Sequence, residues 1–445
     1  MRDNLLSRMR DGGDRFPGIV GFDSTVVPHL ERALLAGHDI VLLGERGQGK
    51  TRMIRGLATL LDEWTPVIEA CEINDHPYEP VCVRCQRLLA EHGEQLPVSW
   101  KHRDDRYGEK LATPDTSVGD LIGDIDPIKV AEGRTLGDPE TVHYGLVPRA
   151  NRGIFSVNEL PDLAERIQVA LLNVLEERDI QVRGYALRLP LDVLLVASAN
   201  PEDYTNRGRI ITPLKDRFGA EVRTHYPLTL DDELSLVRQE AMLGWGEYAV
   251  SAALPDHLLT TVARFTRLVR ESPAVDTRSG VSARFAITAA ETVSASAVRR
   301  TALTGEDSPV ARVCDLPAVI ETLRGKVEFE VSEEGREQEV LEHLLRRATA
   351  ETFRHSLGST DLSGLVERFT DGATVETGDL VPATELLHRI GPVTGLARMM
   401  ERLGMDGGEE APGFAAAAIE LALEGLYLTR RISKDSVDGR TVYRT

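Results

Sequence analysis

The pattern of apolar and polar residues predicts strands and helices in the first half of the chain and mainly helices in the second half. Residues 39–43, 152–157 and 191–199 are short apolar runs, typical of strands buried inside a sheet. Residues 52–61 instead carry apolar side chains at helical spacing. Helical spacing recurs in residues 227–303, 340–345, 386–390 and 414–423. We therefore predict an α/β fold with a parallel sheet, followed by a mostly α-helical region.

Composition narrows the class of protein. The chain has 445 residues, too many for one hydrophobic core, so about two to four domains are expected. Lys and Arg total 52 against 71 Asp and Glu, which gives a net charge of −19. Because so acidic a surface repels a polyanion, general nucleic-acid binding is disfavoured. No apolar stretch reaches the roughly 18 residues that span a bilayer, and residues 1–16 lack the apolar core of a secretory signal. These features predict a cytoplasmic protein with no membrane segment.

A glycine-rich motif follows the first predicted strand and opens the first predicted helix. It reads Gly44, Glu45, Arg46, Gly47, Gln48, Gly49, Lys50, Thr51 and fits G-x-x-x-x-G-K-[ST] at every position. Glycines let backbone N–H groups surround phosphates, and the helix N-terminus adds partial positive charge. Lys50 would reach the β- and γ-phosphates, and the Thr51 hydroxyl would ligate Mg²⁺. The motif predicts binding of ATP with Mg²⁺.

Polar residues end the next two predicted strands. Asn158 and Glu159 follow residues 152–157, where such ATPases usually have Asp-Glu. Glu159 can polarise the attacking water, whereas neutral Asn158 contacts the shell of the metal ion without supplying charge. Asn200 follows residues 191–199 and is the candidate sensor of the γ-phosphate. The alternatives are a plain polar strand end at Asn158 and Glu159, and an Asn that starts a turn before Pro201.

Together these segments resemble the ATPase (I) subunit of magnesium chelatase and its MoxR-like AAA+ relatives. The resemblance covers roughly residues 15–300. It rests on the P-loop and on the runs at residues 16–21, 145–154, 170–177, 199–202 and 216–219. It implies an AAA+ module with a helical lid, assembled as a ring of identical subunits, commonly a hexamer.

The resemblance also implies roles for two arginines. Arg217 matches the arginine that completes a neighbour's active site, although a second family arginine is replaced by Ile211, with Arg207 and Arg209 upstream. Arg284 matches sensor 2, which would contact the γ-phosphate within the same subunit. The alternatives are a structural ion pair for Arg217 and a solvated helix start for Arg284.

Family insertions and composition complete the domain plan. Residues 120–147 resemble the helix-2 insert, and residues 178–189 read as a pre-sensor-1 hairpin that faces partners or the channel, or is only structural. We predict the following parts: a nucleotide-binding domain at 1–226 with a Cys/His insertion at 70–110, a lid at 227–310, a helical region at 311–406, and a helix plus basic hairpin at 411–445. The last part resembles a winged-helix end, for which protein docking is favoured over DNA binding because the chain is acidic.

Three of the four cysteines lie in one short segment that the family normally lacks. Cys82 and Cys85 form a C-x₂-C pair, with Cys71 and His76 upstream. Such spacing predicts a structural Zn²⁺ site with these four ligands. His92 and His102 are rivals for the histidine position. The alternative is a set of reduced, buried cysteines.

The leading functional hypothesis is an AAA+ motor that remodels a partner protein or helps insert a metal or cofactor. The resemblance suggests a separately encoded partner with a von Willebrand A domain. A second hypothesis is an activator that remodels a sigma factor, although the Gly-Ala-Phe-Thr-Gly-Ala loop of those proteins is absent. A third is a nucleotide-gated scaffold with little hydrolysis, which Asn158 would fit.

Overall fold

The computed structural model describes residues 1–132, 141–180, 189–201, 209–244, 251–276, 280–369, 374–405, 412–437 and 440–444. The chain divides into two units, Met1–His225 and Tyr226–Thr445. The nucleotide-binding domain is predicted to end at residue 226. No helix in the described ranges is long and apolar enough to cross a membrane.

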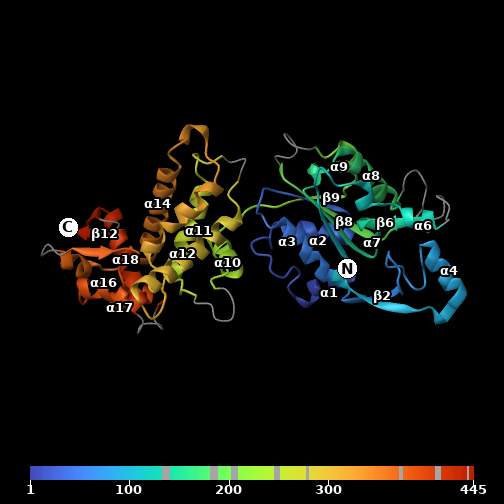
Figure 1. The fold of residues 1–445 in the computed structure, drawn as a ribbon. Helices are drawn as coiled ribbons and strands as arrows, with labels where there is room; N and C mark the ends of the chain where they lie inside the picture. Colours follow the sequence, from blue (N-terminus) through green and yellow to red (C-terminus); the bar gives the residue numbers. More distant parts are fainter. Residues whose placement is uncertain are drawn as a thin grey trace. The chain divides into compact units, whose positions relative to one another are not determined.

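A five-stranded parallel sheet forms the centre of the first unit (Figure 1). Its order is β4 (Tyr107–Leu111), β7 (Gly153–Asn158), β8 (Val193–Ala199), β1 (Ile40–Leu43) and β9 (Ala220–Arg223). The three predicted strands are β1, β7 and β8, so the α/β class with a parallel sheet is confirmed.

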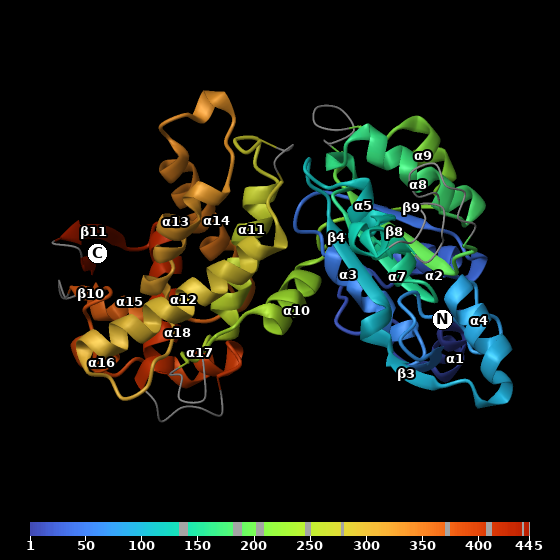
Figure 2. The same cartoon turned by 45° about the vertical axis from the view of Figure 1, so that its right-hand side comes forward.

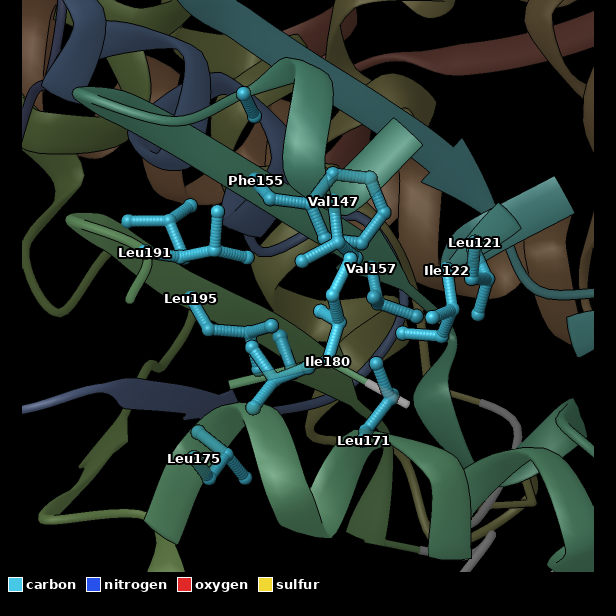
Figure 3. Packing of buried hydrophobic residues seen from close by; sticks show 14 of the residues in the cluster. Leu121, Ile122, Val147, Phe155, Val157, Leu171, Leu175, Ile180, Leu191 and Leu195 are labelled. Carbon is cyan, nitrogen blue, oxygen red and sulfur yellow. The ribbon is translucent and has the colours of Figure 1, made fainter. Parts of the chain in front are cut away.

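Alternate residues of the central strands pack into two cores, one on each face of the sheet. Ile154 and Val196 lie in a core with α1 (Arg2–Asp11), α2 (Val26–Ala36) and α3 (Lys50–Leu57). Phe155 and Leu195 lie in the other core, against α8 (Glu165–Glu177). Figure 3 shows Leu171 and Leu175 of α8 pointing toward these strands. Because strand side chains alternate between faces, a run that is apolar throughout becomes a strand buried on both sides.

Two insertions extend this unit. The first is the antiparallel pair β2 (Trp64–Ile68) and β3 (Val98–His102), with α4 (Val83–His92) between them. The prediction placed this insertion at 70–110, but residues 107–111 form edge strand β4 of the main sheet. The second insertion contains α5 (Val118–Leu121), α6 (Pro127–Ala131) and the pair β5 (Gly123–Ile125) and β6 (Val142–Tyr144). The short helices α7 (Leu146–Arg149) and α9 (Thr212–Arg217) complete the unit. Most of the hairpin predicted at 178–189 lies outside the described residues.

The second unit contains two cores. One joins α10 (Leu230–Glu240), α11 (Asp256–Arg270), α12 (Ala283–Thr304), α13 (Ala318–Leu323) and the first half of α14 (Glu337–Leu357). This core therefore extends beyond the lid end predicted at 310. The other joins the end of α14 to α15 (Ser363–Val366), α16 (Ala383–Ile390), α17 (Leu396–Arg402) and α18 (Pro412–Leu428).

A small antiparallel sheet closes the second core, in the order β10 (Val375–Thr377), β12 (Arg440–Arg444), β11 (Ser433–Val437). The predicted helix and basic hairpin at 411–445 correspond to α18, β11 and β12 (Figures 1 and 2). Helix α18 is buried along nearly its whole length. A helix without an exposed face cannot enter a DNA groove, so α18 is a core helix of its unit.

Candidate functional site

The loop between β1 and α3 has the backbone shape that a phosphate-binding loop needs. Gly47 and Gly49 have positive φ angles of 73° and 77°, in the left-handed region that favours glycine. At Gly44 an added Cβ would lie 1.9 Å from Thr224 Oγ1. Lys50 and Thr51 follow in the first turn of α3, at the positively polarised helix end. Glu45 and Arg46 lie between the first two glycines.

Lys50 connects this loop to the end of the neighbouring strand. Its Nζ donates hydrogen bonds to the carbonyl oxygen of Glu45 at 2.8 Å, to Asn200 Oδ1 at 2.9 Å, and to the carbonyl oxygen of Gly44. Asn200 directly follows β8, and β8 pairs with β1. The carboxyl ends of these parallel strands therefore place the predicted sensor beside the predicted phosphate-binding lysine.

Gln48 holds the loop from inside, a role that the motif does not reveal. Its buried Oε1 accepts hydrogen bonds from the backbone N of Glu45 at 3.0 Å and from Thr224 Oγ1 at 2.8 Å. Thr224 directly follows β9, the strand on the other side of β1. The motif allows any residue at position 48. In this chain Gln48 is held by its contact with Thr224, 176 positions further along the chain.

Asn158, at the end of β7, lies against a carboxylate that the sequence analysis missed. Its Nδ2 donates to Glu109 Oε1 at 2.6 Å, and its Oδ1 accepts from Ser198 Oγ at 3.3 Å. Glu109 in turn pairs with Arg55 of α3 through two hydrogen bonds of 2.8 and 3.0 Å. The Arg55 guanidinium lowers the pKa of Glu109, so its carboxylate stays ionised. Because a carboxylate accepts and a hydroxyl can donate, these neighbours fix the amide with its oxygen toward Ser198.

Glu159 directly follows Asn158, and its backbone is strained. Its φ of 56° is in the left-handed region, which is uncommon for a residue other than glycine. Its backbone N donates to Ser198 Oγ at 3.2 Å, and its side chain is exposed. Such strain is often found at functional sites, where surrounding contacts hold the backbone. Ser198 thus contacts both residues of the Asn-Glu pair.

The two predicted arginines lie in different units. Arg217 ends α9, and its Nε donates to Glu176 Oε2 at 2.7 Å, so the ion pair raises the pKa of this arginine. Arg284 is an exposed residue in the first turn of α12, in the second unit. Of the upstream arginines, Arg209 is described and exposed, while Arg207 lies outside the described residues.

The cysteine segment forms a cluster whose fourth member differs from the prediction. Ligand atoms of Cys71, Asp75, Cys82 and Cys85 all lie within 4.8 Å of one another. His76 is not in this group. Its Nδ1 accepts a hydrogen bond from the backbone N of Tyr78 at 3.2 Å, and its ring packs on that of Tyr78. The rivals His92, at the end of α4, and His102, beside Asp104, are also outside the group.

The three thiols of the cluster form hydrogen bonds with one another, and these bonds shift their pKa values in opposite directions. Hydrogen bonds from the Cys82 and Cys85 thiols lower the pKa of Cys71 to about 2. The hydrogen bond with Cys71 is in turn the main cause that raises the pKa of Cys82 and that of Cys85. The spacing of the cysteines and nearby histidines gives no indication that Asp75 belongs to the cluster.

The sheet order, the loop between β1 and α3, and the polar ends of β7 and β8 define the fold of an AAA+-type P-loop nucleotide-binding protein. Comparison with known proteins agrees with this class, because the Sigma-54 interaction domain family matches residues 134–217. Part of the chain is similar to the ATPase subunit of magnesium chelatase. Subunit ChlI of Anabaena variabilis is 30% identical over 194 residues, which are 42% of this chain and 52% of that protein. The ChlI of Cyanophora paradoxa is 31% identical over 211 residues, 45% of this chain and 56% of that protein.

The chain spans about half the length of the curated relatives that it matches. Among solved structures, the cryo-EM-based model of the complex between subunits BchI and BchD of magnesium chelatase covers 95% of this chain and 97% of the matched chain. Its sequence identity is 18% and its TM-score is 0.37.

Proposed function

We propose that this chain binds ATP with Mg²⁺ at residues 44–51 and hydrolyses ATP as a ring of identical subunits, hexameric as in the resembled family. The observation that carries the proposal is the contact of Lys50 with both its own loop and Asn200. This contact brings together, at the carboxyl edge of one sheet, the lysine proposed to bind phosphate and the asparagine proposed as the sensor. Oriented donors at such an edge stabilise charge on transferring phosphoryl groups.

The residues at the ends of β7 and β8 fit the remaining tasks of hydrolysis. The Glu159 carboxylate would polarise the attacking water, and Asn200 would orient it. Thr51 and Asn158 would hold the magnesium ion and its water shell, and the ion would neutralise phosphate charge. Arg217 would act on a neighbouring subunit and Arg284 on its own nucleotide.

The main test compares turnover in the parent chain with that in Lys50→Ala and Glu159→Gln. A magnesium-dependent ATPase that both variants abolish supports the proposal. Tight ATP binding without turnover in the parent would instead support the nucleotide-gated scaffold. The specific observation that favours that scaffold is the neutral Asn158, which lies where the family has a carboxylate.

We propose that ATP hydrolysis drives the remodelling of a partner protein, or the insertion of a metal or cofactor with the help of that partner. The curated relatives are subunits of a larger enzyme, which supports a separate partner, and the resemblance suggests one with a von Willebrand A domain. A pull-down from native extract with Glu159→Gln, which should hold ATP and trap partners, tests this. Recovery of such a protein supports the proposal.

The second candidate is activation of transcription through a sigma factor. It is favoured by the family match at residues 134–217. Recovery of RNA polymerase in the same pull-down would establish this candidate and overturn the chelatase-like one. Recovery of neither, from an extract in which both are detected, would contradict both.

A further inference from the structure

The cysteine cluster has the size of a site for one metal ion. Zinc–sulfur bonds of about 2.3 Å in a tetrahedral complex place two sulfur ligands roughly 3.8 Å apart. The ligand atoms of Cys71, Asp75, Cys82 and Cys85 all lie within 4.8 Å of one another, close to that spacing. Three of the four residues are buried, and Cys71 is half-buried. One ion at the centre could therefore contact all four with small movements.

Asp75 gives an independent indication of a cation. Its side chain is buried, with 1% exposure. Oδ2 accepts a hydrogen bond from the backbone N of Cys82 at 2.9 Å, but Oδ1 has no hydrogen-bond partner among the described residues. A buried carboxylate oxygen without a partner is costly unless a cation or donor contacts it. A metal ion among the three sulfur atoms would supply that contact.

The backbone around the sulfur atoms also suits thiolates. The backbone N of Asp75 donates to Cys71 Sγ at 3.4 Å, and that of Cys85 donates to Cys82 Sγ at 3.3 Å. Cys82 is the N-cap of α4, a ten-residue helix whose first turn carries partial positive charge. Hydrogen bonds of this kind orient metal ligands.

We propose that Cys71, Asp75, Cys82 and Cys85 bind one structural Zn²⁺ ion. Three thiolates and one carboxylate give the same ligand charge as the four thiolates of many structural zinc sites. All four tetrahedral positions are occupied by protein atoms, which is typical of a structural rather than a catalytic ion.

The site fixes a loop that is bonded to the segment before β7. Asn74 Nδ2 donates to the carbonyl oxygens of Arg149 at 2.7 Å and Asn151 at 3.2 Å. In return, Asn151 Nδ2 donates to the carbonyl oxygen of Ile73 at 3.0 Å. Residues 71–75 therefore support the segment that leads into β7, the strand that ends at Asn158 just before Glu159. Removal of the ion should loosen this part of the first unit without removing any nucleotide contact.

The test is zinc content of the full chain purified under reducing conditions. We expect one zinc per chain in the parent, and zinc lost from Cys85→Ser. His76→Ala and Cys314→Ser should keep one zinc, because His76 lies outside the cluster and Cys314 lies in the second unit. Lys50→Ala should also keep it, so failure of the zinc site and failure of the nucleotide site are distinguishable. Zinc retained by Cys85→Ser, or lost from His76→Ala with the fold intact, would overturn the ligand assignment.

Cobalt substitution of the parent keeps the proposal testable if a cysteine variant does not fold. Co²⁺ in this site should show thiolate charge-transfer absorption and the visible bands of a tetrahedral complex. Asp75→Asn should keep the thiolate absorption but bind Co²⁺ at least about tenfold more weakly, since it loses an anionic ligand. A parent chain with reduced thiols that binds neither Zn²⁺ nor Co²⁺ would overturn the proposal, as would native iron in place of zinc.

Discussion

Replacing Asn158 with Asp, the residue usual in related ATPases, should weaken this protein unless Glu109 is changed as well. Asn158 Nδ2 donates to Glu109 Oε1 at 2.6 Å. In Asn158→Asp that donor becomes a second carboxylate oxygen, so two acceptors face each other. The hydrogen bond is lost and a like-charge contact replaces it.

The size of the effect follows from Coulomb's law. Two unit charges about 4 Å apart at an effective dielectric constant of about 20 repel by about 4 kcal/mol, equivalent to a pKa rise of about 3 units. The Glu109 side chain is 21% exposed and is paired with Arg55, so we expect about half of this, roughly 2 kcal/mol. Because Arg55 lowers the pKa of Glu109, the carboxyl group introduced by the substitution takes the proton.

The sign of the pH dependence follows from this raised pKa. An acid whose pKa is higher in the folded than in the unfolded state destabilises the fold as pH rises through the folded value. Asn158→Asp should therefore be close to the parent in stability near pH 3.5, below the pKa of Asp in both states, and lose about 2 kcal/mol near pH 8.

The assay is denaturant unfolding at both pH values, with Glu109→Gln/Asn158→Asp as the matched control. In the double variant an amide again donates to a carboxylate, so stability at the higher pH should return and the site gains the family's Asp. We expect magnesium-dependent turnover at least equal to that of the parent. If Asn158→Asp matched the parent near pH 8, or the double variant were no more stable than Asn158→Asp, the contact with Glu109 would be refuted.

Two further predictions concern Glu159, the proposed catalytic residue, and helix packing. Glu159→Gln should keep ATP affinity and lower turnover by about 10²–10⁴-fold, measured in a steady-state phosphate-release assay; unchanged turnover would remove Glu159 from the mechanism. Gly425→Ala should destabilise the second unit by about 1–3 kcal/mol in thermal unfolding, because its Cβ would lie 2.1 Å from a ring carbon of Phe353. Gly56→Ala, in α3, is the control, since its Cβ meets nothing within 4 Å and should be neutral or stabilising by up to about 1 kcal/mol.

The parts of the fold that the sequence predicts are those in which burial makes the pattern simple. Strands β1, β7 and β8 are buried on both faces, so each appears as a mostly apolar run. Edge strand β4 was missed because its residues, Tyr-Gly-Glu-Lys-Leu, form no apolar run and are half-exposed or exposed. The same holds for β9, at the other edge.

The residues of the candidate site also divide into those that the sequence predicts and those that only the fold brings together. A local motif predicts residues 44–51 because phosphate binding restricts consecutive positions. No local signal indicates Glu109, which meets Asn158 only because β4 pairs with β7, 49 residues away. Asp75 was missed for a different reason, since carboxylates are frequent on the surface and only burial beside the three cysteines distinguishes this one.

The most direct test of the central claim is a calorimetric titration of the folded chain with ATP in the presence of Mg²⁺, in parallel with Lys50→Ala. The parent should bind ATP, and the variant should bind at least about tenfold more weakly, because one charge-assisted contact of about 1.5–3 kcal/mol is lost. Absence of binding to the well-folded parent, or equal affinity in both chains, would contradict the assignment of residues 44–51 as the nucleotide site.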